Sequence, residues 1–248
     1  LVNRVTALEH NTPVPVPIPD PPPVPIPVVG QFYSPTSSWT TKLVSPKFTD
    51  LAALHQGGWW LNSGDYGVPV VHAGSGSPVT VNTPESWGWP AAQLQFMIPD
   101  SASGATGTDN SLTIIDGTTA YDFWGFNRSG NTANPASWAK SDLVKGTGWG
   151  QASPFLAAGI HAAGSALLAG LIVGNELKTG INHALAVAVR RNLGGPFIPP
   201  AIASDPGLTG PIHEGQRLAI PASTAMTVTT TPGKMIWKAM LDYGAFVI

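Results

Sequence analysis

The 248-residue sequence has no cysteine, which excludes disulfide bonds and thiolate metal sites as sources of stability. Charged residues are also scarce, at 10% of the chain against roughly 25% in ordinary soluble proteins, and the net charge is −2. The longest basic run is the pair Arg190 and Arg191. Nucleic-acid binding needs clustered lysine and arginine, so the composition argues against a nucleic-acid partner.

Signatures of metal and nucleotide chemistry are missing as well. The histidines lie at positions 10, 55, 72, 161, 183 and 213, with no paired ligand spacing, so we expect no metal site. No glycine-rich phosphate loop precedes a predicted helix, and no serine lies on the strand-to-helix elbow of a hydrolase. We therefore expect no cofactor.

One apolar run, over residues 155–173, is long enough to suggest a membrane span. His161 and Ser165 interrupt it, glycines lower its helical propensity, and no aromatic belt or basic flank follows it. Ser153 and Pro154 make a good helix start. We therefore predict one or two short buried helices packed on a sheet, and no membrane span.

The first thirty residues combine a heptad fragment with a proline arm. Leu1, Val5 and Leu8 have the spacing of a coiled-coil seam, so residues 1–11 predict the end of a coiled coil that continues upstream. Prolines alternate mostly with valine and isoleucine in residues 12–30, which requires an extended backbone. Two interpretations stay open, an ordered arm lying along a partner and a mobile linker.

Residues 31–248 are predicted to form one head domain, a mainly β, jelly-roll-type β-sandwich with a few short inserted helices. A strong hairpin is expected over residues 111–124, with Asp116 and Gly117 in its turn. Further strands are predicted at 69–72, 79–81, 94–98, 181–189, 217–220 and 245–248, and a helix at 234–243. The expected core residues are Leu112, Ile114, Phe123, Leu171, Leu185 and Val187.

Residues 121–124 (Tyr-Asp-Phe-Trp) and 181–185 (Ile-Asn-His-Ala-Leu) are the most specific parts of a wider pattern. The pattern also includes residues 109–116, 168–172, 176–177 and 242–245. It resembles a family of secreted jelly-roll proteins of actinobacteria and the heads of minor tail proteins from mycobacteriophage-like viruses. The resemblance covers residues 32–248. It implies an extracellular virion protein, a homotrimer that contacts other tail proteins.

Asp122 and Trp124 share one face of their predicted strand, and a carboxylate beside an indole is a common sugar-binding pair. Glu176 and His183 are candidates for a general acid and base. The alternative for all four is structural. Asp122 would then brace a turn, Trp124 would fill the core, and His183 would be a hydrogen-bonded core histidine.

Tryptophans are frequent in the predicted loops. Trp59, Trp60, Trp87 and Trp89 lie in turn-rich segments. Exposed indoles on loops suit binding to sugars or lipids. The alternative is that these rings fold back and cap the ends of the sandwich.

Two functions follow from these observations. The first is a non-enzymatic structural and adhesive tail protein whose head contacts the glycan or lipid of the host cell envelope. The alternative is a domain that cleaves cell-wall polysaccharide, as a glycoside hydrolase or lyase, through Asp122, Glu176 or His183. The chain lacks the Glu-x-Asp-x-Glu strand of laminarinase-like jelly rolls and the Gln-Ile-His strand of alginate-lyase-like ones, which favours binding over cleavage.

Overall fold

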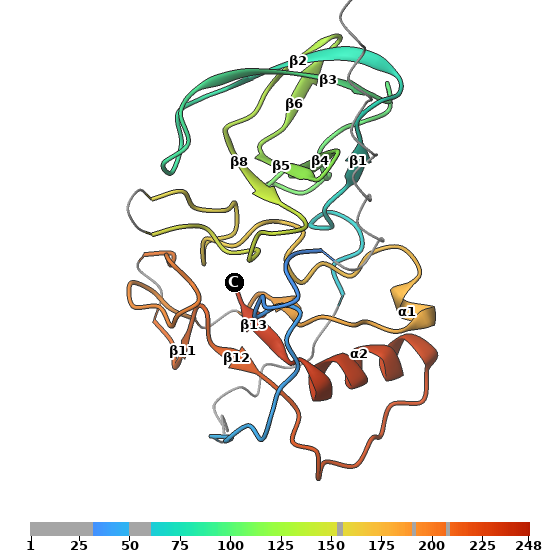
Figure 1. Cartoon of the computed structure of the whole chain (residues 1–248), viewed down its shortest axis with the longest axis vertical. Helices are drawn as coiled ribbons and strands as arrows, with labels where there is room; N and C mark the ends of the chain where they lie inside the picture. The colour runs from blue at the N-terminus through green and yellow to red at the C-terminus, as the bar shows by residue number, and fades with distance from the viewer. Residues whose placement is uncertain (1–31, 50–60, 153–155, 190–191, 207–208) are drawn as a thin grey trace, which may run out of the picture.

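The computed structural model describes residues 32–49, 61–152, 156–189, 192–206 and 209–248. Within these ranges thirteen strands form four sheets and there are two helices, which confirms a mainly β protein (Figure 1). The predicted coiled-coil residues Leu1, Val5 and Leu8, the proline arm 12–30, and the loop residues Trp59 and Trp60 lie outside the described residues.

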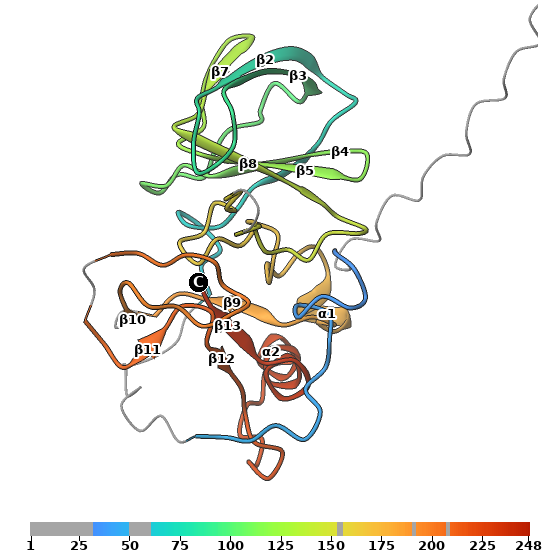
Figure 2. The ribbon, with the colours of Figure 1, turned by 60° about the vertical axis from the view of Figure 1, so that its left-hand side comes forward.

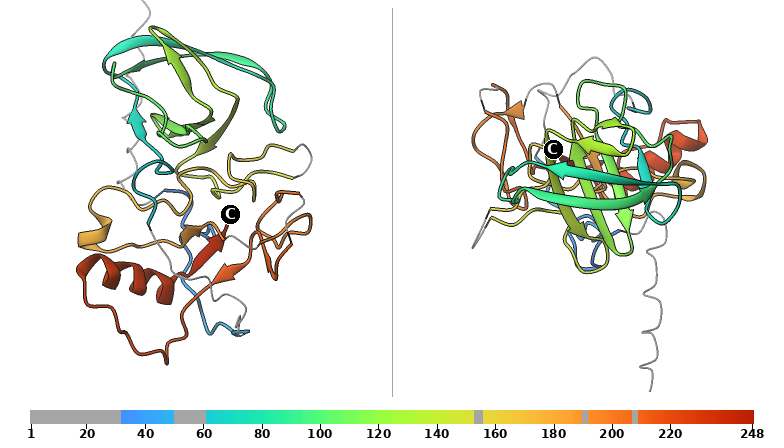
Figure 3. Two further views of the ribbon diagram at one scale, coloured as in Figure 1. Left: turned by 180° about the vertical axis from the view of Figure 1, so that it is seen from behind. Right: turned by 90° about the horizontal axis from the view of Figure 1, so that it is seen from above.

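Two four-stranded sheets form a β-sandwich in the upper half of Figure 1. One sheet has the order β1 (Val70–His72), β4 (Leu112–Asp116), β5 (Thr119–Trp124), β8 (Ser137–Asp142). The other has the order β3 (Ala92–Ile98), β2 (Ser77–Thr83), β7 (Thr132–Asn134), β6 (Asn127–Ser129). Strands β2 and β3 cross over the strands of the first sheet, as the view from above in Figure 3 shows.

The interior of the sandwich is filled by apolar side chains from alternate strand positions. Val81 and Ile98 of the second sheet pack with Leu112, Ile114 and Phe123 of the first, and all five are buried. Alternation then places the intervening residues of β4 and β5 on the opposite face of their sheet. That second face carries the residues that connect the sandwich to the rest of the protein.

The predicted hairpin is present, with antiparallel pairing from Leu112 opposite Phe123 to Asp116 opposite Thr119. Asp116 is therefore the last residue of β4, and the turn consists of Gly117 and Thr118. Gly117 has φ +58°, a left-handed conformation that glycine adopts without steric cost.

The C-terminal half packs against the second face of the β1–β8 sheet, below the sandwich in Figure 2. A sheet of order β12 (Arg217–Leu218), β13 (Ala245–Val247), β9 (Leu185–Val187) lies beside helices α1 (Glu176–Thr179) and α2 (Thr231–Asp242). A two-stranded sheet joins β10 (Asn192–Leu193) and β11 (Ile212–His213). Ile115 and Ala120 share one buried cluster with Trp39, Leu168 and Phe246, so both halves have a common core.

Helix α2 confirms the helix predicted at 234–243 and begins three residues earlier than predicted. The Thr230 side chain caps its first turn by accepting a hydrogen bond from the Gly233 amide (3.2 Å). The helix ends before Gly244, whose φ is +73°. Its apolar side packs on Ile181 and Leu185.

The helices predicted within residues 155–173 are wrong for the described part, residues 156–173, which consists of turns and irregular backbone. Gly164 and Gly170 have φ values of +80° and +78°, which interrupt a helix. The Gly170 carbonyl instead accepts a hydrogen bond from Ala186 (3.1 Å). Within the described residues no helix is both long and apolar enough to span a membrane.

The predicted strand 181–189 is shorter than expected, because only β9 has strand pairing. Ile181, His183 and Leu185 are buried, which confirms the core position expected for Leu185. Among the other expected core residues, Leu112, Ile114 and Phe123 are buried, whereas Leu171 and Val187 are only half-buried.

Candidate functional site

A cleft of about 700 Å³ lies where the end of the sandwich meets the C-terminal half. Its walls come from residues 66–68, from the 105–111 and 156–162 segments, and from residues 203–206. Three large aromatic rings line it with much of their surface exposed: Tyr66 (49%), Trp87 (49%) and Trp124 (39%). Partly exposed rings inside a concave site are available to stack on a ligand.

Trp87 is held in the cleft by a strained turn. Its φ is +42°, an uncommon left-handed value for a residue with a side chain, and Ser86 pairs with Trp89 across the turn. The Trp87 carbonyl accepts a hydrogen bond from the Ala158 amide (3.1 Å). A Cβ atom at Gly88 would lie 1.4 Å from the Leu156 carbonyl oxygen, so only glycine allows this close approach.

Trp89, predicted as a second ligand-binding indole of this turn, has an anchoring position instead. Its ring is half-buried against Trp138, with centroids 5.6 Å apart, and its Nε1 donates to the Ala158 carbonyl (2.8 Å). It is not among the residues that line the cleft. Trp89 therefore fixes the turn that presents Trp87, which agrees with the capping alternative for this one ring.

Trp124 and Asp109 are neighbours in the cleft. The indole Nε1 of Trp124 donates to Asp109 Oδ1 at 3.4 Å, and the Asp109 carbonyl accepts from the Gly125 amide (2.8 Å). The Asn110 side chain donates to the Phe126 carbonyl (3.0 Å) and secures the same loop. The Asp109 carboxylate is thus held beside an exposed ring, the arrangement of a common sugar-binding pair.

Tyr66 belongs to a loop that is tied to the 104–110 segment. The Thr106 hydroxyl donates to Asp65 Oδ1 (2.6 Å), and the Gly107 amide donates to the Asp65 carbonyl (2.7 Å). The Tyr66 and Thr108 hydroxyls share a hydrogen bond of 3.3 Å. These contacts place the Tyr66 ring at the cleft without burying it.

His161 contributes an uncharged ring to the same cleft. Its Nδ1 lies 3.0 Å from Ser165 Oγ, and its backbone amide donates to the Ser165 carbonyl (3.1 Å). Burial lowers the pKa of His161 to about 4, against a smaller opposing effect of a hydrogen bond with the Ala166 backbone. The imidazole is therefore neutral at physiological pH and offers hydrogen bonds without positive charge.

Asp122, predicted to share a glycan-binding patch with Trp124, is fully buried and has no access to the cleft. Its Oδ1 accepts from the Thr113 hydroxyl (2.6 Å) and its Oδ2 from the Leu167 amide (2.8 Å). Burial raises its pKa to about 6, partly offset by these two bonds. We expected Asp122 to contact a ligand directly. In the structure it instead links the sandwich to the C-terminal half through its bonds to Thr113 and Leu167.

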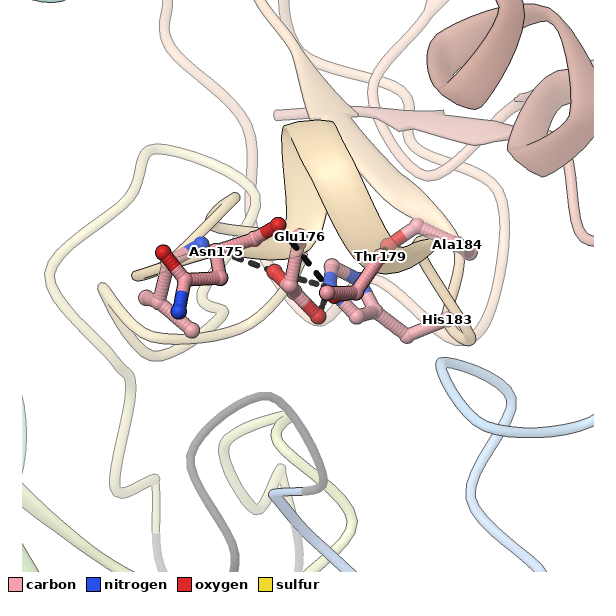
Figure 4. Close-up of polar contacts among 6 residues, drawn as sticks. Asn175, Glu176, Thr179, His183 and Ala184 are labelled. Carbon is pink, nitrogen blue, oxygen red and sulfur yellow. Dashed lines mark hydrogen bonds and ion pairs between the residues drawn. The ribbon is translucent and has the colours of Figure 1, made fainter. Parts of the chain in front are cut away.

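Glu176 and His183, the predicted acid and base, do contact each other (Figure 4). His183 Nε2 lies 3.2 Å from Glu176 Oε1 and 3.3 Å from Oε2, and both side chains are buried. Glu176 Oε2 also accepts from the Val173 amide (2.8 Å), and His183 Nδ1 lies 2.8 Å from the Ala184 carbonyl. Neither residue lines the aromatic cleft.

The surroundings of this pair suggest a structural role. A carbonyl only accepts hydrogen bonds, so His183 Nδ1 must donate, and the contact with Glu176 needs one further proton on either partner. The pair connects α1 to the segment before β9. This is the hydrogen-bonded core histidine of the alternative interpretation.

Sequence reasoning identified Trp87 and Trp124 but missed Tyr66, Asp109 and His161. Tyr66 and Asp109 lie in turn-rich segments, a signal that could have marked them as loop residues. In the sequence, His161 is a histidine without paired ligand spacing and an interruption of the apolar run, and neither feature marks a binding residue. No local pattern indicates that these segments meet.

No protein-family profile, curated protein or solved structure matches the chain. Within the described ranges there is also no group of three or more histidine, aspartate or glutamate side chains that could hold a metal ion. The function of this chain is therefore inferred from the residues that line the cleft.

Proposed function

We propose that the chain is a non-enzymatic structural and adhesive head of a phage tail, and that its aromatic cleft binds glycan of the host cell envelope. The observation that carries the glycan-binding part is the presence of three exposed aromatic rings in one cleft. The setting in a phage tail rests on the resemblance described from the sequence.

Stacking is the physical basis of this proposal. The flat apolar face of a sugar ring packs on an indole or phenol ring, while carboxylates and amide groups accept hydrogen bonds from its hydroxyls. Trp124 beside Asp109 offers both kinds of contact. Such contacts depend little on long-range charge, so we expect binding to be nearly independent of salt between low and physiological ionic strength.

The positions of the candidate catalytic residues favour binding over cleavage. Asp122 is closed off from the cleft, and Glu176 and His183 are engaged with each other outside it. The enzymatic alternative would need other carboxylates, and Asp109 and Asp205 both line the cleft. A reducing-end assay on host envelope polysaccharide tests this alternative, because cleavage that disappears in the Asp109→Asn variant would establish an enzyme.

Binding itself is tested by removing the rings. Losing one stacked ring costs about 1–2 kcal/mol, so the double variant Trp87→Ala/Trp124→Ala should bind envelope polysaccharide roughly 30-fold more weakly or worse. Phe197→Ala is the matched control, because this ring is 41% exposed but lies outside the cleft. Affinity electrophoresis measures both variants, with circular dichroism to verify folding. Unchanged binding by the double variant would contradict the proposal.

The proposed assembly is a homotrimer whose copies act together. Three identical sites raise the effective concentration, so weak single-site binding becomes firm attachment. Leu1, Val5 and Leu8 are the proposed oligomerisation residues, and other tail proteins are the proposed partners. Sedimentation of a chain that includes the upstream heptads tests this, and a monomer at micromolar concentration would refute it.

The jelly-roll class stays a prediction for residues 31–248. Eight strands in two four-stranded sheets favour it. The parallel pairs β1–β4 and β2–β7 do not, because Greek-key connections join antiparallel strands.

A further inference from the structure

We propose that the aromatic cleft selects uncharged polysaccharide and rejects polysaccharide that carries carboxylate or phosphate groups. This inference rests on the proposed glycan-binding function and names the chemical class of its ligand. It starts from the charged groups that the cleft presents together with its rings.

The ionisable side chains along the cleft are acidic or neutral. Asp109 and Asp205 both line it and are exposed, and each carries a carboxylate. His161 is a neutral imidazole because burial disfavours its charged form. Among the described lining residues there is no lysine or arginine. A ligand in the cleft therefore meets negative charge without a compensating positive charge from these residues.

Neither carboxylate is neutralised by an ion pair within the described part of the chain, where the ion pairs involve other acids. Asp109 is hydrogen-bonded to the uncharged Trp124 indole. The charge of Asp205 acts on another acid, because it helps to raise the pKa of the Glu214 carboxyl after the larger effect of burial. Within the described residues, neither cleft aspartate therefore has a basic partner.

The two arginines in the described part of the chain are occupied by other contacts. Arg128 donates to the carbonyls of Pro99 and Ala102 and lies 3.7 Å from Asp100. Arg217 donates to the carbonyls of Tyr243 and Thr41. Neither arginine lines the cleft. Within the described residues, neither arginine therefore compensates the charge of the cleft carboxylates.

The consequence differs for the two ligand classes. The hydroxyls of an uncharged sugar can donate to Asp109 and Asp205 while its apolar face stacks on Trp87 or Trp124. An acidic sugar in the same position brings like charges into contact, which is a common way in which a site rejects the wrong ligand. The rings supply affinity, and the aspartates supply selection by charge.

The test uses the full chain and polysaccharide from an actinobacterial cell wall, separated by anion exchange into a neutral and an acidic fraction. Part of the acidic fraction is amidated with carbodiimide, which removes the charge of its carboxylates and keeps its backbone. We expect binding to the neutral fraction, at least tenfold weaker binding to the acidic fraction, and a gain after amidation. Binding to the acidic fraction should rise with salt, because salt screens repulsion.

The variants assign the effect to the two aspartates. For Asp109→Asn/Asp205→Asn, the ratio of acidic-fraction affinity to neutral-fraction affinity should rise at least tenfold over that of the unaltered chain. Affinity for the neutral fraction should itself fall, because each asparagine keeps only one acceptor oxygen and loses the charge. The Asp109→Asn change keeps a side-chain oxygen that can accept from the Trp124 indole. Asp100→Asn/Asp116→Asn is the control with the same change in net charge, since neither residue lines the cleft.

Each outcome separates the two proposals. Equal or tighter binding of the acidic fraction overturns the selection by charge. Arg190 and Arg191 lie outside the described residues. If changing both to glutamine abolishes tight binding of the acidic fraction, these arginines attract acidic glycan, and the selection by charge is likewise overturned. Binding to neither fraction, before or after amidation, overturns the proposed glycan-binding function itself.

Discussion

The buried carboxylate of Asp122 allows a quantitative test of how the two halves of the protein are joined. Asp122→Ala removes the acceptor for the Thr113 hydroxyl and the Leu167 amide, leaving two buried donors without partners. Each unpaired donor costs about 1–3 kcal/mol, so at pH 4 the variant should lose roughly 2–6 kcal/mol of unfolding free energy. At the same pH, Asp122→Asn should lose about 1 kcal/mol, because its oxygen can accept from Leu167 and the Thr113 hydroxyl can reverse to accept from its amide.

The pH dependence of stability gives an independent measure of the same group. Burial raises the folded-state pKa of Asp122 to about 6, above the unfolded value near 3.9. Between these values the folded state binds more protons, so the contribution of Asp122 to stability is present below about pH 4 and is lost as pH rises toward 6. A shift of about two pKa units corresponds to on the order of 3 kcal/mol.

Urea denaturation at pH 4, 5, 6 and 7 measures both effects. The stability of the Asp122→Asn variant relative to the unaltered chain should increase from pH 4 to pH 7, because asparagine does not titrate. Asp116→Asn, at the exposed end of the same hairpin, is the control and should change stability by less than about 0.5 kcal/mol. Equal stabilities of Asp122→Ala and the unaltered chain at pH 4, or a pH-independent difference for Asp122→Asn, would refute the reasoning.

Three further changes test the turn that carries Trp87, the buried contact between Glu176 and His183, and the core. Gly88→Ala brings a Cβ atom against a backbone carbonyl, so it should weaken glycan binding and lower stability by more than about 2 kcal/mol; Gly117→Ala, with open space around it, should cost about 1 kcal/mol and leave binding unchanged. Glu176→Ala should lower the unfolding free energy by about 3 kcal/mol in a denaturation assay. Glu176→Gln keeps a hydrogen-bond donor for His183 and should lower it by only about 1 kcal/mol. Equal losses would contradict the hydrogen bond between residues 176 and 183. Leu185→Ala should cost roughly 2–5 kcal/mol, and a negligible change would show that this buried side chain contributes little to the core.

Local signals in the sequence were sufficient for the hairpin of residues 112–124 and for helix α2. The alternating apolar residues and the glycine of residues 112–124 predicted a hairpin, because both signals act between neighbouring positions. The helix 231–242 was predicted, apart from its first three residues, from its composition and the closing Gly244. These elements form from interactions that are close in the chain.

The segment 156–173 shows where such reasoning stops. Its apolar composition indicates burial correctly, since Leu167 and Leu168 are buried, but burial does not distinguish a helix from an irregular segment. The segment forms turns at its glycines because other parts of the backbone approach them closely, as Ala186 approaches Gly170. That approach depends on strands that are distant in sequence.

The residues proposed to bind glycan depend partly on local sequence and partly on tertiary packing. The sequence by itself indicated that Trp87 and Trp124 are available for binding, because turn residues around them predict exposed loops or strand ends. Only the tertiary structure brought Tyr66, Asp109 and His161 to the same cleft and removed Asp122 from it. Strand alternation places Asp122 and Trp124 on the same face of the sheet. The C-terminal half packs over Asp122 and leaves Trp124 exposed at the edge of this contact. No local sequence pattern indicates where the contact ends.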